Sequence, residues 1–148
     1  MFDHMATTKS TDFLARGKIL SITGKTVVFR PSNTNYELHI GVAGNEPPTV
    51  SDQPIHATIR VRARKVWTVP SGGNFIAPIF GQPKIIQGRV KWLDDRTLVV
   101  HAGTDFVVEM PASDQAVDLA NGVIGVGSLV NVTAMPGATF ELRAPVAV

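Results

Sequence analysis

The chain contains two segments that resemble each other, and this similarity limits the folds that it can adopt. "GKILSITGKTVVFRPSNTNYELHI" (17–40) aligns with "GRVKWLDDRTLVVHAGTDFVVEM" (88–110), with one residue deleted in the second segment. Further along, the initial spacing of 71 aligns Ile59 with Val130. Repetition at a fixed spacing is typical of a chain built from two similar structural units. We therefore interpret the chain as an internal duplication with a spacing of about 71 residues.

Each copy has the sequence pattern of short β-strands separated by turns. β-branched residues are frequent and the 3.6-residue spacing of an amphipathic helix is absent, which favours strands. Gly, Pro, Asn and Ser residues between the apolar runs favour turns. A polar connection then follows in each copy, and Ser113 or Asp114 could cap one helical turn in the second. The strands expected in the first copy cover 17–23, 26–30 and 36–40, with a fourth near 58–66.

Three strands, a connection and two further strands is the order of an OB-fold barrel, and small SH3-like barrels have similar strand counts. The sequence therefore predicts an all-β protein of two tandem small five-stranded barrels, OB-like or SH3-like. The predicted parts are a flexible N-terminal segment (1–14), a first barrel (15–69), a Gly/Pro-rich hairpin or clamp between the repeats (70–87) and a second barrel (88–148).

The predicted clamp is the place where the two copies differ most. Its Gly and Pro residues favour turns, and we expect a hairpin across "PSGGN" (70–74) that is laid over the second barrel. The segment is too apolar for a free linker, so we expect burial of its large side chains, which are Phe75, Ile76, Ile79 and Phe80.

Composition excludes several classes of site. The 148 residues include no cysteine, which removes disulfides, thiolate metal sites and cysteine nucleophiles. The four histidines do not show metal-ligand spacing, His39 is expected on a solvated strand face, and Asp94-Asp95 is expected in a turn. Apolar runs are short, and no secretory leader pattern opens the chain. We therefore expect a cytoplasmic, non-catalytic protein that uses no metal or cofactor and does not enter a membrane.

Charge is distributed unevenly along the chain. Residues 1–90 carry 11 Lys/Arg against 5 Asp/Glu, whereas residues 91–148 carry 3 against 7, for an overall charge of +2. A basic first half can attract an anionic partner, and it can equally attract the acidic half of another copy.

The basic half contains a row of alternating arginines in "TIRVRARKV" (58–66). Strand alternation places Ile59, Val61 and Ala63 in the core. Trp67 falls on the core side of the same pattern unless a kink exposes it. Neighbouring outward stems lie roughly 6–7 Å apart along a strand, which is close to the spacing of phosphates in a nucleic-acid strand. The residues expected on the outer face are Thr58, Arg60, Arg62 and Arg64.

Cations beside aromatic rings are typical of surfaces that bind single-stranded nucleic acid. We therefore expect a basic face on the first barrel that contacts single-stranded nucleic acid or another polyanion. The candidate binding residues are Arg60, Arg62, Arg64, Lys65, Trp67, Arg30, Lys25 and Tyr36, with Phe29 and Phe75 as further rings nearby.

Two other interpretations of the arginine row stay open. The arginines can be the solvated face of a strand, with Glu37 as a partner across the sheet. The chain can also be a structural or adaptor protein that forms homo-oligomers or scaffolds other proteins, because its second copy is partly apolar on the corresponding face.

Overall fold

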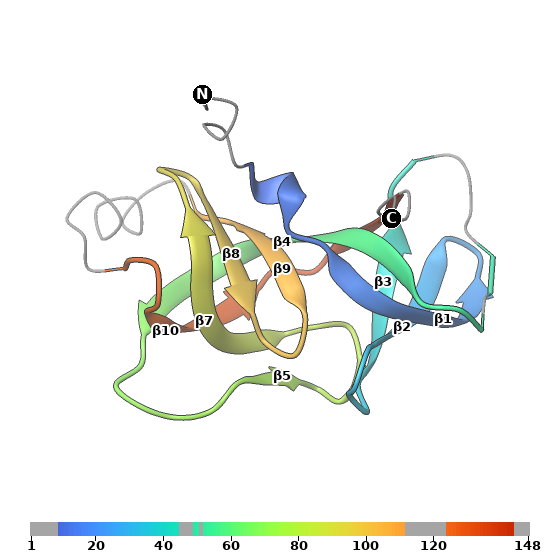
Figure 1. Ribbon diagram of the computed structural model, residues 1–148, viewed down its shortest axis with the longest axis horizontal. Coiled ribbons are helices and arrows are strands. Elements are labelled where there is room, and N and C mark those ends of the chain that lie inside the picture. Colours follow the sequence, from blue (N-terminus) through green and yellow to red (C-terminus); the bar gives the residue numbers. More distant parts are fainter. Residues whose placement is uncertain (1–8, 45–48, 51, 112–123, 144–148) are drawn as a thin grey trace, which may run out of the picture.

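The computed structural model describes residues 9–44, 49–50, 52–111 and 124–143, and it confirms the prediction of an all-β protein (Figure 1). Its strands form a single mixed sheet. The elements are a 3₁₀-helix η2 (Ser10–Asp12) and the strands β1 (Ala15–Thr23), β2 (Thr26–Pro31), β3 (Glu37–Val42), β4 (Ile55–Thr68), β5 (Phe75–Ala77), β6 (Phe80–Gly81), β7 (Ile85–Leu93), β8 (Thr97–His101), β9 (Asp105–Glu109), β10 (Leu129–Ala134) and β11 (Thr139–Arg143).

The strand pairings close two circuits that share β4. The sheet order is β1-β2-β3-β11-β4-β10-β7-β8-β9, and β4 also pairs with β1 and with β9. One circuit is therefore β1-β2-β3-β11-β4, and the other is β7-β8-β9-β4-β10. In each circuit one pairing is parallel, β3 with β11 and β4 with β9, and the others are antiparallel.

The two aligned sequence segments form matching antiparallel meanders, β1-β2-β3 and β7-β8-β9. The first strand of each has a register shift at the same aligned position, around Leu20 and around Lys91. Each meander also brings a glycine against the neighbouring backbone. A Cβ atom on Gly17 or Gly88 would lie 2.2 or 2.0 Å from a carbonyl oxygen, so no larger residue fits at either position without a backbone shift.

One long strand, β4, connects the halves of the molecule. The first part of β4 pairs with β1 up to Ala57, and its next part pairs with β9 from Arg60. β10 and β11 run antiparallel to β4, β10 along its last part and β11 along its first. Consequently β11, from the part of the chain predicted to form the second barrel, lies between β3 and β4, from the part predicted to form the first. The five strands of each circuit are thus not contiguous in the sequence, unlike the tandem order expected above.

The pairings also correct the alignment of the fourth strands. Gly17 pairs with Ile55, and its counterpart Gly88 pairs with Val130. Ile55 and Val130 are 75 residues apart, so the spacing of 71, or 70 after the deleted residue, holds for the meanders but not for the strands that follow. With the spacing of 75, the second-copy counterparts of Arg60, Arg62 and Arg64 are Met135, Gly137 and Thr139, none of which carries a charge.

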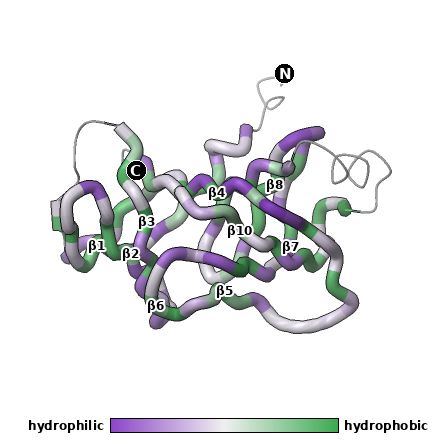
Figure 2. Tube along the Cα trace, turned by 180° about the vertical axis from the view of Figure 1, so that it is seen from behind, coloured by the Kyte–Doolittle hydropathy of each residue, from purple (hydrophilic) through white to green (hydrophobic). Residues whose placement is uncertain are grey.

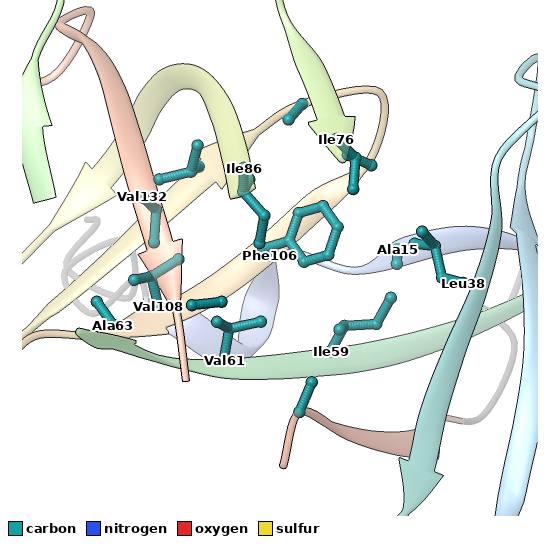
Figure 3. Packing of buried hydrophobic residues seen from close by; sticks show 14 of the residues in the cluster. Ala15, Leu38, Ile59, Val61, Ala63, Ile76, Ile86, Phe106, Val108 and Val132 are labelled. Atoms are coloured by element: carbon teal, nitrogen blue, oxygen red, sulfur yellow. The ribbon is translucent and has the colours of Figure 1, made fainter. Parts of the chain in front are cut away.

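A single hydrophobic cluster fills both halves of the molecule. Figure 3 shows that Ile59, Val61 and Ala63 point from β4 toward Phe106 and Val108 of β9. The inward side of the predicted alternation is therefore confirmed, because all three β4 side chains are buried. Thr58 was expected on the outer face but is only 1% exposed, because β4 crosses there from one circuit to the other.

The segment 70–87 connects both halves, although it does not fold as a hairpin across 70–74. β5 pairs with β7, and β6 pairs with β3. β10 and β7 lie between β4 and β5, so the 70–74 turn carries the chain across two strands. We expected four large apolar side chains of this segment to be buried, but only Ile76 is buried. The other three are exposed: Phe75, Ile79 and Phe80.

Two predicted segments lie partly or wholly outside the described residues. The helical turn expected after Ser113 or Asp114 falls in 112–123, which the structure does not describe. Within the N-terminal segment expected to be flexible, the described residues include the helix η2, and the ring of Phe13 lies 5.4 Å from the Lys91 ammonium group.

Candidate nucleic-acid interface

A β-bulge in β4 determines which side chains reach the outer face of the sheet. Ala63 pairs with Ala134 and Lys65 pairs with Thr133, so Arg64 is an extra residue in β4. A bulge interrupts the alternation of a strand. Arg64 and Lys65 are consequently both exposed, Val66 is buried and Trp67 is again exposed, at 41%. Simple alternation would place Trp67 on the core side, and the bulge is the kink that exposes it instead.

The bulge gathers cations beside Trp67. Figure 2 shows the hydrophilic stretch along β4. The side chains of Arg62 and Arg64 are exposed, and neither forms an ion pair within the described part of the chain. The Lys65 ammonium group lies 5.5 Å from the centre of the Trp67 ring, which is a cation–π distance. Four of the predicted binding residues, Arg62, Arg64, Lys65 and Trp67, therefore form one surface, which we call the β4 basic surface.

Two predicted arginines are already paired with carboxylates. Arg60 is half-buried and donates to Glu141 at 3.2 Å. Arg30 donates to Glu37 at 2.7 Å, so Glu37 pairs with this arginine and not with the row. An acidic residue also borders the β4 basic surface, because Glu109 is the Cα partner of Arg62 across β4 and β9.

The other predicted residues lie away from the β4 basic surface. Lys25 lies between β1 and β2, at the opposite end of the sheet from Trp67 (Figure 1). The Tyr36 hydroxyl accepts a hydrogen bond from the backbone N–H of Ile76 at 3.1 Å, which joins β5 to the first half. Phe29 is fully buried in the core. Tyr36 and Phe29 therefore support the fold, and Lys25 lies far from the β4 basic surface.

A shallow pocket of about 450 Å³ adjoins the β4 basic surface. Arg64 and Lys84 line it together with mostly apolar residues, among them Ile85 and Pro136. Lys84 is exposed and was not among the predicted binding residues. Its position beside Arg64 depends on the pairing of β7 with β10, which no local sequence pattern indicates.

A row of four cross-strand partners leads from this surface across the sheet, and its third member, Gln87, is buried and bonded to the backbone of Gly73. Trp67 of β4 pairs with Asn131 of β10, Asn131 pairs with Gln87 of β7, and Gln87 pairs with Phe75 of β5. Direct partners in antiparallel strands share one face of the sheet. Phe75 is 37% exposed, so both ends of the row present an aromatic ring to solvent.

The described part of the chain holds no group of three His, Cys, Asp or Glu side chains placed to bind a metal ion. It also holds no helix that is long and apolar enough to cross a membrane. Comparison of the chain with protein-family models, with curated proteins and with solved structures finds no match.

Proposed function

We propose that this chain is a non-catalytic, cytoplasmic protein that binds single-stranded nucleic acid on the β4 basic surface. The observation that carries the proposal is the bulge at Arg64, which puts Arg62, Arg64, Lys65 and Trp67 on one exposed face. Surfaces that bind single strands combine cations along the phosphate backbone with aromatic rings for the bases. The β4 basic surface supplies both within six residues of one strand.

The spacing of the cations fits a phosphate backbone. Arg62 and Arg64 are two residues apart, so their Cα atoms are separated by at most about 7 Å even where the bulge departs from the regular strand rise. Neither has a carboxylate partner among the described residues, so phosphate oxygens would not have to displace one. A guanidinium group can also bind a phosphate through two hydrogen bonds at once.

We further propose that the two circuits are OB-like barrels derived from an internal duplication. The matching register shifts at Leu20 and Lys91 support this relationship, as do the matching close approaches of Gly17 and Gly88. OB-folds commonly bind oligonucleotides on one face of the barrel. The corresponding positions of the second copy carry no cations. The cations on β4 are then a specialisation of this one strand.

Replacing Arg62 and Arg64 with Ser should weaken binding of a labelled 20-nucleotide thymidine strand by roughly tenfold to a hundredfold at low salt. Each phosphate contact to a single strand contributes about 0.7 to the slope of log affinity against log salt concentration. The double variant should therefore reduce the magnitude of that slope by about 1.4, because two phosphate contacts are lost. Fluorescence anisotropy titrations at several salt concentrations measure both quantities.

The matched control is the Arg16→Ser, Lys18→Ser variant. Both residues are exposed on β1, outside the β4 basic surface, and their loss changes the net charge by the same amount. The control should keep nearly all of the affinity and the slope. Equal losses in the two variants would show that net charge, not this surface, attracts the strand, and absence of binding by the unmodified protein at low salt would refute the proposal.

Exposed apolar residues favour self-assembly as a second candidate function. Ile79 and Phe80, next to and within β6, are 54% and 62% exposed. If they bury each other between copies, light scattering should show a dimer or larger species that the Ile79→Ser, Phe80→Ser variant loses. A strict monomer at millimolar concentration would exclude this candidate.

A further inference from the structure

The row Trp67–Asn131–Gln87–Phe75 lies on the outer face of the sheet. Figure 3 shows Ile76, Ile86 and Val132, which are chain neighbours of Phe75, Gln87 and Asn131, pointing into the core. Successive side chains of a strand point to opposite faces, so the members of the row point outward. Adjacent strands are about 4.8 Å apart, so the backbones of the two aromatic residues are separated by roughly 14 Å.

The hydrogen bonds of the two amides in this row have a fixed direction. The Gln87 Nε2 atom lies 2.9 Å from the backbone oxygen of Gly73, which can only accept. The Gln87 Oε1 atom must therefore face Asn131, and the Asn131 Nδ2 group donates to it at 3.0 Å. This order leaves the Asn131 Oδ1 atom as an acceptor, with no partner among the described residues, between the two exposed rings.

Cations flank the row on both sides. Lys65 is two residues from Trp67 on the same face, with its ammonium group 5.5 Å from the ring centre. Arg89 is two residues from Gln87 and is exposed, although one of its nitrogens donates to the oxygen of Gly127 at 2.9 Å. A ligand at the Trp67–Asn131 end of the row would thus have an exposed aromatic ring beside it and positive charge near its edges.

We propose that this row is the site at which the protein recognises nucleobases. A base stacks on the exposed ring of Trp67 and donates a ring or exocyclic N–H to the Asn131 Oδ1 atom. This inference rests on the proposed binding of single strands. It adds that the protein contacts the bases as well as the phosphates. The flanking cations favour a nucleic acid over a neutral glycan, which also stacks on aromatic rings.

The test compares a thymidine strand with an abasic strand of the same length and charge. The thymidine strand should bind at least tenfold more tightly, because stacking on one or more aromatic side chains adds to the phosphate contacts. Trp67→Ala and Asn131→Leu should each weaken binding of the thymidine strand more than binding of the abasic strand, which reduces this difference. Circular dichroism of each variant checks that the fold is retained.

A second measurement follows Trp67 directly. The chain has two tryptophans, Trp67 and Trp92, so Trp92→Phe leaves Trp67 as the sole indole fluorophore. The thymidine strand should quench its fluorescence strongly and the abasic strand should not. This readout does not depend on variants of the row and therefore remains valid if those variants are unstable.

The outcomes separate the two proposals. Equal binding of both strands without a change in Trp67 fluorescence would overturn base recognition while leaving phosphate binding intact. Binding of neither strand would overturn both. Binding of a neutral oligosaccharide such as cellohexaose, with no response to the thymidine strand, would assign the row to a glycan instead.

Discussion

Replacing Phe140 with Ala should lower the free energy of unfolding by about 4 kcal/mol, the upper part of the range for a buried phenylalanine. Phe140 lies on β11 and is fully buried, with its ring centre 5.3 Å from that of Phe29 on β2. Removing the ring leaves a cavity at the place where β11 closes the first circuit. Urea denaturation of the variant and of the unmodified protein measures the loss.

The control for Phe140 is its neighbour on the same strand. Leu142 is 49% exposed, so Leu142→Ala should cost no more than about 0.5 kcal/mol. A Phe29→Ala, Phe140→Ala double-mutant cycle should give a coupling of roughly 1 kcal/mol, because the rings are in tilted contact. If Phe140→Ala were as stable as Leu142→Ala, β11 would not be part of this core.

Gly88→Ala should destabilise the protein by about 3 kcal/mol through a clash with the backbone. An added Cβ would lie 2.0 Å from the carbonyl oxygen of His101 and 3.1 Å from the Cβ of Ala102. The nearest atom belongs to the main chain, so β7 and β8 would have to separate locally to make room. Thermal denaturation followed by circular dichroism should show a lower melting temperature.

Gly125→Ala is the matched control, because a Cβ at Gly125 meets no atom within 4 Å and its φ is not positive. That variant should unfold at nearly the same temperature as the unmodified protein. Gly17→Ala, the counterpart of Gly88→Ala in the first meander, should be destabilised to a similar degree, since its Cβ would lie 2.2 Å from the oxygen of Arg30. A neutral effect of both substitutions would contradict the tight pairing of the first two strands in each meander.

Local sequence patterns predicted the strands well but only half of the candidate site. The runs 17–23, 26–30 and 36–40 correspond to β1, β2 and β3. The expected turn at Asp94-Asp95 is also present, because the Asp94 carboxylate accepts hydrogen bonds from the backbone N–H groups of Arg96 and Thr97. Such features depend on residues close in the chain, which is why the sequence indicates them.

The remaining site residues depended on distant partners. Arg60 and Arg30 looked like free cations, but Glu141 and Glu37 neutralise them. Lys84 lies beside Arg64 of the β4 basic surface only because β7 and β10 pair. The Arg60–Glu141 and Arg64–Lys84 relations have no signal in the spacing of the residues, whereas Arg30 and Glu37 are seven residues apart on the neighbouring strands β2 and β3.

The sequence by itself determined that the chain forms β-strands, that two similar meanders occur in it, and that Ile59, Val61 and Ala63 face the core. These properties follow from alternation and turn chemistry, which act over a few residues. Only the tertiary structure decided that β11 closes the first circuit, that a bulge at Arg64 turns Trp67 outward, and that Trp67 shares a row with Phe75. Those outcomes depend on which strands pair and in what register, and the burial of one shared core selects that pairing over the whole chain at once.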